Sequence, residues 1–387
     1  MLLLTVALTS GAHSSDDGHG GAARLCRDGT CASLHDIAHV RKVAFAAASP
    51  VASRSSYSSC CHSCDRVSSC SGSGGDEHHI VNLFLPHVAA PPGNRARRFL
   101  EIGGFDGLRE TNTLFVEHCL GWDGLLIEAQ PTAFAQLKEN RPGVLTLHAA
   151  ACTGNATHVT FVDSGDTNGK IFISKAACAN TPCEKTSRVP CVKLGTALPK
   201  LGFERIDYFS LDTQGAELLV AQSVDWNAVQ AAVIVVEEIR VTVAKNRQVA
   251  ALLHDIGMVR AVTLCWRSGA ICDGYFVNPK LVDMAGLSVA IGATNFGAEQ
   301  AKGLGRGCHA EKSTDKGGDA WLLANHGNGR GKQRQYLNMS VDCKTHDEGR
   351  KYPYKGHCAL CGDVGKAWRA SKPGALQHLT EDNWKNC

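Results

Sequence analysis

The fold of this chain is decided by FLEIGGFDG, residues 99–107, where an apolar strand runs directly into a glycine-rich turn. Glycine in such a turn lets the backbone approach a ligand closely. A second apolar run, LLI at 125–127, ends in Glu128 about twenty residues later, the interval at which an acid accepts hydrogen bonds from both hydroxyls of a ribose. Turn and acid together predict a site for a cofactor that contains adenosine.

The sequence of the turn also distinguishes between two adenosine-containing cofactors, a dinucleotide and S-adenosylmethionine. The pattern Glu101-x-Gly103-x-x-x-Gly107 lacks the third glycine that a dinucleotide needs beside its pyrophosphate. S-adenosylmethionine carries no phosphate, and carboxylates such as Glu101 and Asp106 stabilise its sulfonium and ammonium charges. The expected cofactor-binding residues are Glu101, Gly103, Gly104, Asp106, Gly107 and Glu128.

Short apolar runs alternate with helix-like stretches from residue 97 to residue 278, which is typical of a parallel sheet covered on both faces. We expect strands at 99–103, 124–128, 144–149, 206–212, 232–237, 258–264 and 274–278. We expect helices at 111–119, 131–140, 216–223 and 247–255. No helix separates the last two strands, so they are predicted to pair as an antiparallel hairpin.

Four blocks of the sequence resemble the FkbM family of methyltransferases and occur in the family's order. They are residues 101–107, TNT at 111–113, GWDGLLIE at 121–128 and IDYFSLDTQGAE at 206–217. The resemblance implies a Rossmann-like class I methyltransferase fold, with a mostly parallel seven-stranded sheet whose last strand is antiparallel. It also implies S-adenosylmethionine as methyl donor and a hydroxyl of a sugar or natural product as acceptor. Phe105 and Ala129-Gln130 depart from the family's usual residues.

Asp212 ends the fourth expected strand, at the edge where ligands bind in open α/β sheets. A carboxylate there can orient an acceptor hydroxyl and take its proton during methyl transfer. We therefore expect Asp212 to be the catalytic base, while the alternative is that it caps the helix beginning near Gly215. Glu237 and Glu238 end the next strand, and strand alternation turns only one of them toward the cleft.

Composition limits the class of protein and its partners. The chain has 387 residues, of which 44% are apolar and 20% charged, which excludes wholesale disorder and allows a globular enzyme. Its formal net charge of +3 gives no basic stripe for phosphates, so we expect no nucleic-acid partner. No run of about eighteen apolar residues occurs, so we expect no transmembrane segment.

Composition also divides the chain into four parts. Residues 1–12 are a short apolar run ending in small residues, which predicts a signal peptide. Residues 13–79 are rich in Ser, Gly, Ala and Cys, which predicts a low-complexity tether. The methyltransferase domain is expected to cover residues 80–286, and a cysteine-rich tail domain residues 287–387.

Cysteines and sequons favour the secretory pathway, with a luminal or secreted location. The chain has 18 cysteines and two glycosylation acceptor triplets, at Asn155 and Asn338. Cys265 and Cys272 are expected to pair across the turn between the last two strands. The tail motifs CKTH at 343–346 and CALC at 358–361 also suit zinc, but an oxidising compartment favours disulfides, so no metal is expected.

Two other classes of function remain open at this point. A non-catalytic secreted or luminal interaction protein could retain the methyltransferase fold, because fold does not fix function. A nicotinamide-dependent oxidoreductase is disfavoured by the incomplete dinucleotide pattern. The favoured prediction is an O-methyltransferase whose acceptor is a small molecule or a glycan.

Overall fold

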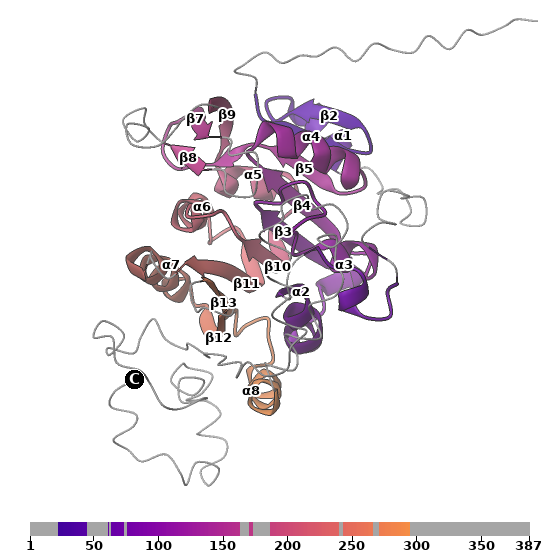
Figure 1. Ribbon diagram of the computed structural model, residues 1–387, viewed down its shortest axis with the longest axis vertical. Helices are drawn as coiled ribbons and strands as arrows, with labels where there is room; N and C mark the ends of the chain where they lie inside the picture. The colour runs from indigo at the N-terminus through magenta and orange to yellow at the C-terminus, as the bar shows by residue number, and fades with distance from the viewer. Residues whose placement is uncertain are drawn as a thin grey trace, which may run out of the picture.

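The computed structural model describes residues 22–44, 61, 63–72, 76–162, 170–172, 186–239, 243–265 and 271–294 (Figure 1). The expected signal peptide, the expected tail beyond residue 294 and the sequon at Asn338 lie outside the described residues. Within the described part of the chain, no helix is both long and apolar enough to cross a membrane.

The core is a nine-stranded sheet in the order β12-β13-β11-β10-β3-β4-β5-β1-β2. Its central strands β11, β10, β3, β4 and β5 run parallel, whereas β13 is antiparallel to both β11 and β12. The strands are β1 (Arg24–Arg27), β2 (Thr30–Ser33), β3 (Arg98–Ile102), β4 (Asp123–Glu128), β5 (Leu145–His148), β10 (Arg205–Leu211), β11 (Gln230–Ile239), β12 (Val259–Cys265) and β13 (Ile271–Val277).

The sheet has nine strands and not the expected seven, because an N-terminal hairpin extends it. β1 and β2 pair with each other, and β1 pairs antiparallel with β5. Leu25 of β1 is fully buried, and a disulfide between Cys26 and Cys31 closes the hairpin. The expectation of a tether is therefore wrong for residues 22–44. Two four-residue strands are too short to give a readable sequence period, and the free edge of β5 supplies their partner.

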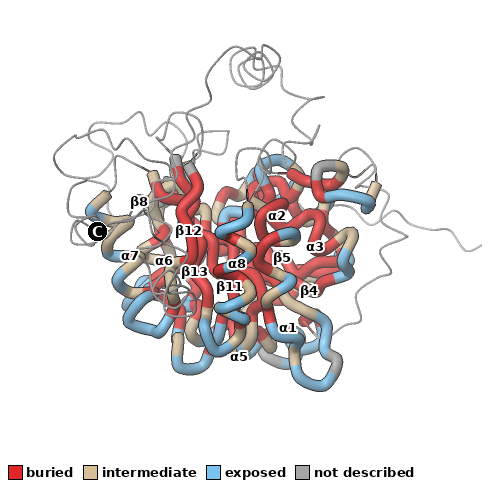
Figure 2. Tube along the Cα trace, turned by 90° about the horizontal axis from the view of Figure 1, so that it is seen from below, coloured by how far each residue is buried: buried red, intermediate tan, exposed pale blue. Residues whose placement is uncertain are grey.

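Helices cover both faces of the sheet, so the strands lie buried between two outer layers (Figure 2). One face packs against α1 (Ile37–Ala44), α5 (Leu194–Lys200), α6 (Glu217–Ser223) and α7 (Val243–Asp255). The other face packs against η4 (Ile80–Phe84), α3 (Leu114–His118), α4 (Pro131–Asn140) and α8 (Met284–Ala293). The shorter turns are η3 (Val67–Ser69), α2 (Asp76–His79), η5 (Leu85–His87) and η6 (Pro92–Asn94).

Helix α8 crosses the expected end of the domain at residue 286. Leu287 and Ile291 of α8 are buried in the apolar cluster that also contains Phe84 of η4. The folded domain thus extends at least to the end of α8. The sequence did not predict α8, because Gly286 and Gly292 interrupt its short apolar pattern.

A second, smaller sheet was not expected from the sequence. It has the order β6-β9-β7-β8 and consists of β6 (Ala150–Ala151), β7 (His158–Val162), β8 (Lys170–Phe172) and β9 (Thr186–Val192). A disulfide between Cys152 and Cys191 joins the end of β6 to β9. This sheet follows directly after β5, so it lies beside the carboxyl ends of the central strands.

Further disulfides attach the segment before β3 to the domain. Cys64 is bonded to Cys119, directly after α3, and Cys61 is bonded to Cys70. Cys272 of β13 is also disulfide-bonded, and its register partner on β12 is Cys265. Part of the region expected to be a tether is therefore covalently fixed against α3.

A buried arginine connects α3, α4 and the glycine-rich turn. Arg141, directly after α4, forms an ion pair with Glu117 of α3, and their side chains are 0% and 1% exposed. Arg141 also donates hydrogen bonds to the carbonyl oxygens of Gly107, at 3.0 Å, and Thr113, at 3.2 Å. A buried charge is tolerated only when it is paired and hydrogen-bonded, as this one is. The contact with Gly107 fixes the outer side of the turn.

Candidate cofactor and acceptor site

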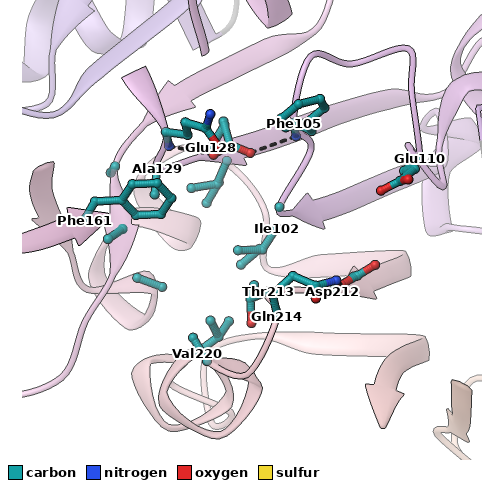
Figure 3. Close-up of a pocket in the computed structure, with 17 residues that line it drawn as sticks. Ile102, Phe105, Glu110, Glu128, Ala129, Phe161, Asp212, Thr213, Gln214 and Val220 are labelled. Atoms are coloured by element: carbon teal, nitrogen blue, oxygen red, sulfur yellow. Dashed lines mark hydrogen bonds between the residues drawn. The ribbon is translucent and has the colours of Figure 1, made fainter. Parts of the chain in front are cut away.

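A pocket lies at the carboxyl ends of β3, β4 and β10, with an empty volume of about 730 Å³ including its open mouth. Figure 3 shows Glu128 and Phe105 on one side of it, with Asp212, Thr213 and Gln214 across from them. The lining residues are Ile102, Gly103, Phe105, Glu110, Ile127, Glu128, Ala129, Gln130, Ala149, Ala150, Ala151, Phe161, Asp212, Thr213, Gln214, Ala216 and Val220. All charged residues among them are acidic.

Gly103 is required where β3 meets the segment after β10. Its φ of 92° lies in the region that favours glycine. A Cβ atom at this position would lie 1.9 Å from the carbonyl oxygen of Asp212. The absence of a side chain therefore lets two of the expected site residues, Gly103 and Asp212, line the same pocket.

Glu128 ends β4 and is held rigidly by backbone N–H groups. Its Oε2 accepts a hydrogen bond from Phe105 N at 2.8 Å, and its Oε1 accepts one from Gln130 N at 2.6 Å. Burial raises the pKa of this carboxyl to about 7, against the lowering effect of these hydrogen bonds. A carboxylate has about four acceptor sites, so Glu128 can still accept a hydrogen bond from a ligand hydroxyl.

Glu101 does not line the pocket, although the sequence placed it among the cofactor-binding residues. It accepts hydrogen bonds from the hydroxyls of Thr111, at 2.7 Å, and Thr113, at 2.5 Å, and from Asn112 N at 2.8 Å. Burial raises the pKa of Glu101, and the nearby charge of Arg141 opposes this. Glu101 therefore anchors the segment 111–113 to β3, on the side of the strand away from the pocket lining.

Asp106, Gly104 and Gly107 also lie outside the pocket lining and support the turn. Asp106 accepts hydrogen bonds from the backbone of Leu108 and Arg109 and pairs with the Arg109 side chain at 2.8 Å. A Cβ atom on Gly107 would lie 2.5 Å from Leu137, and one on Gly104 would lie 3.1 Å from Leu126. These glycines therefore allow α4 and β4 to pack closely against the turn.

Asp212 follows β10 and lies beside Glu237 of the neighbouring strand β11. The side-chain amide of Gln214 donates to Asp212 Oδ1 at 3.2 Å and to Glu237 Oε1 at 3.3 Å. Burial, followed by the Glu237 charge, raises the pKa of Asp212 well above its ordinary value. Burial raises the pKa of Glu237 to about 7. Two carboxyl groups therefore meet at the pocket, bridged by one amide.

The structure decides between Glu237 and Glu238, which sequence alternation alone left open. Glu238 lies on the opposite side of β11, where both of its oxygens bind Arg260, at 2.6 and 3.0 Å. Glu237 shares the donor of Gln214 with Asp212 instead. Glu237 is therefore the one of the two acids that lies beside the pocket residues Asp212 and Gln214.

Helix α6 has no side-chain N-cap, which argues against the capping alternative for Asp212; its first residue, Glu217, binds the preceding turn instead. Glu217 Oε1 accepts hydrogen bonds from Gly215 N at 2.7 Å and from the backbone and hydroxyl of Thr213. These bonds satisfy the first N–H groups of the turn that leads into the helix. The hydrogen bond of Asp212 goes to a side chain, so its carboxyl group lies free of the helix backbone.

The sequence did not reveal Glu110, Gln214 or Phe161 as pocket residues. Glu110 and Gln214 have positive φ angles of 57° and 53°, which no local sequence pattern encodes. Phe161 belongs to β7 of the unexpected second sheet. Gln214 lies two residues after Asp212 in the sequence, and this proximity was the one available sign that Gln214 lines the pocket.

Residues 89–258 match the family model described as "Methyltransferase FkbM domain". The match covers the glycine-rich turn, Glu128, Asp212 and Glu237. The resemblance inferred from the four sequence blocks is thereby confirmed for residues 89–258. No curated protein sequence matches the chain.

Several solved structures share distant similarity with this chain. Precorrin-6y C5,15-methyltransferase from Geobacter metallireducens is 10% identical, with TM-score 0.28, covering 47% of this chain and 80% of that one. A human methyltransferase 10 domain containing protein is 11% identical, with TM-score 0.30, covering 52% and 79%. Mitomycin 7-O-methyltransferase MmcR is 11% identical, with TM-score 0.26, covering 52% and 53%.

Among the described residues, no group of three or more His, Cys, Asp or Glu side chains is placed to hold a metal ion. The tail motifs that suit zinc, between Cys343 and Cys361, lie outside the described residues.

Proposed function

We propose that this protein is an S-adenosylmethionine-dependent O-methyltransferase that transfers a methyl group to a hydroxyl of a glycan or another small molecule. The observation that carries the proposal is the pocket at the carboxyl ends of β3, β4 and β10. It combines a ribose-binding acid, Glu128, with a carboxylate, Asp212, across the same cavity. Both residues lie in the sequence blocks that resemble the FkbM family.

The hydrogen bonds of the turn support S-adenosylmethionine over a dinucleotide. The N–H groups of Gly103 and Gly104 both point to Ile127 O, at 2.9 and 3.5 Å, and that of Phe105 donates to Glu128. A pyrophosphate requires free N–H groups in this turn. Each of these three donors already has an acceptor within the protein, and the charged pocket residues are all acidic. A cation is favoured in such surroundings, and a phosphate is not.

The rest of the lining suits the other parts of the donor. Ala129, Phe161 and the segment 149–151 form an apolar wall close to Glu128, where an adenine ring could pack. Asp212 and Thr213 lie across the pocket, where the methyl group would be presented to an acceptor. When bound, S-adenosylmethionine supplies an electrophilic methyl group on a positively charged sulfur.

Asp212 is the proposed base of the reaction. Transfer of the donor's methyl group to an acceptor hydroxyl would require removal of the hydroxyl proton. The hydroxyl proton passes to the Asp212 carboxylate, which needs to be within hydrogen-bond reach of the acceptor. Glu101, Gly104, Asp106 and Gly107 are proposed to act indirectly, by holding the turn.

Calorimetric titration of the full chain with S-adenosylmethionine and with NAD tests the proposal. We expect S-adenosylmethionine to bind and NAD not to bind. Binding of NAD alone would favour an oxidoreductase, and binding of neither ligand would favour an interaction protein that retains the fold.

Replacement of Glu128 by Ala is expected to weaken S-adenosylmethionine binding. The ribose hydroxyls lose a charged acceptor, which costs about 1.5–3 kcal/mol, or about tenfold to 150-fold in Kd. The same titration measures the effect. The matched control is Glu139→Ala, an exposed acid on α4, which should leave Kd unchanged. Equal affinities in both variants would remove Glu128 from the cofactor site.

A location in the secretory pathway, with cleavage of residues 1–12 and glycosylation at Asn155, is also proposed. Asn155 is exposed, and nine cysteines of the described residues are disulfide-bonded. Peptide mapping without reduction should recover the pairs Cys26–Cys31, Cys64–Cys119 and Cys152–Cys191. We also expect the pair Cys265–Cys272. Recovery of mostly free thiols, or of bound zinc in the tail, would contradict this location.

A further inference from the structure

The carboxyl group of Asp212, which lines the pocket, lies against the carboxyl group of Glu237 on β11. Asp212 and Glu237 are within hydrogen-bond reach of each other, and the amide of Gln214 donates to one oxygen of each. Glu237 is 8% exposed, and its second oxygen, Oε2, is buried with no hydrogen-bond partner in the described structure. Two like charges at this distance cannot both be ionised at low cost, so one proton is shared between them.

The groups around the pair add negative rather than positive charge. The ammonium group of Lys245 of α7 donates to the carbonyl oxygen of Gly215. Arg260 is occupied by Glu238 on the other side of β11. The acids that face the pair from the neighbouring elements are Glu110 after β3, Glu217 of α6, Asp76 of α2 and Asp273 of β13, the register partner of Glu237.

We propose that Asp212 and Glu237 share one proton in the free protein, and that the positive charge of S-adenosylmethionine expels this proton when it binds beside Asp212. Donor binding itself would then produce the carboxylate that accepts the hydroxyl proton. This inference rests on the proposed function. It assigns to Glu237, which the sequence could not distinguish from Glu238, the role of a positioning residue that controls the protonation of Asp212.

The protons balance over one reaction cycle. The shared proton leaves to the solvent on donor binding, and the acceptor's hydroxyl proton replaces it on the pair during transfer. The product S-adenosylhomocysteine has no positive charge on sulfur, so the pair retains this proton when the product leaves. The protein thus returns to its starting state after each turnover, with one proton released in total. A base is present only while the charged donor is bound.

The test is calorimetry near pH 7 in buffers that differ in ionisation enthalpy, which counts the protons released per ligand bound. S-adenosylhomocysteine is the matched ligand, because it carries the same ribose but lacks the sulfonium charge. Any proton change at Glu128, which contacts the ribose, should therefore be equal for both ligands. We expect S-adenosylmethionine to release more protons than S-adenosylhomocysteine, by an excess that approaches one.

The pH dependence of the Kd for S-adenosylmethionine tests the loss of this proton independently of calorimetry. The pair must lose its proton for the charged ligand to bind well, so the Kd for S-adenosylmethionine should fall as pH rises from about 6 to 8. Over the same range, the ratio of the two ligands' Kd values should shift up to tenfold per pH unit in favour of S-adenosylmethionine. A constant ratio would overturn the inference without the use of any variant.

Replacement of Glu237 by Gln removes one of the two acids and keeps the shape of the side chain. The excess of protons released by S-adenosylmethionine should then fall close to zero, while Glu139→Gln, the exposed control on α4, should keep the full excess. Equal proton counts for both ligands in the wild-type protein, or an unchanged excess in E237Q, would overturn the inference. Absence of S-adenosylmethionine binding would instead overturn the proposed function itself.

Discussion

Asp212→Asn is expected to lower kcat about a hundredfold to ten-thousandfold at saturating donor, while S-adenosylmethionine still binds. The substitution keeps the shape of the side chain and its contact with Gln214 but removes the charge that takes the hydroxyl proton. A mixture of oligosaccharides would first be screened for transfer of a labelled methyl group. Wild type and variant are then compared at saturating donor with the acceptor found.

The Asp212 result has a clear alternative outcome. If affinity and activity fell in proportion, Asp212 would bind the donor, and the base would have to be sought at Glu237. If Glu237 replaces Asp212 in part, the remaining activity should disappear in the double variant D212N/E237Q. Glu128→Ala is the complementary variant, because its main effect should be on Kd.

Arg141→Met is expected to lower the free energy of unfolding by about 3–5 kcal/mol, the range for breaking a buried ion pair from one side. Glu117 would be left as an uncompensated charge with 1% exposure. The carbonyl oxygens of Gly107 and Thr113 would also lose donors. Denaturant unfolding monitored by circular dichroism measures the change.

Arg109→Met is the matched control for this loss. Arg109 also pairs with an acid, Asp106, but its side chain is 46% exposed, and such surface pairs contribute about 0–1 kcal/mol. The double variant Arg141→Met/Glu117→Gln should recover part of the stability, because it removes the unpaired charge. A loss at Arg141 no larger than that at Arg109 would show that the buried pair is not required.

The central strands could be predicted from the sequence because their apolar runs are continuous. Parallel strands buried on both faces are apolar throughout, which distinguishes them from half-exposed strands. β3, β4, β5 and β10 begin and end within one or two residues of the expected positions. The ends of β3, β4 and β10 then placed Gly103, Glu128 and Asp212 at one edge, where the structure has its pocket.

The sequence motif alone did not show which of its residues line the pocket. The motif that contains Gly103 also contains two acids, Glu101 and Asp106, which form hydrogen bonds within the protein. It contains two further glycines, Gly104 and Gly107, which allow close packing because they have no side chain. Successive residues of a strand and turn point in different directions. Which of them reach the pocket depends on φ angles such as the 92° of Gly103, which only the folded turn defines.

The sequence by itself determined the class of domain, the position of the glycine-rich turn and the two carboxylates at its edge, because local periodicity and glycine placement are properties of short segments. The tertiary structure alone decided the N-terminal hairpin, the second sheet with Phe161, and the contact of Asp212 with Glu237. Asp212 and Glu237 meet because parallel pairing places β11 beside β10, with Leu211 opposite Val236. Contacts between residues so far apart in the chain follow from strand order and register, which are set by burial of the whole sheet rather than by any one segment.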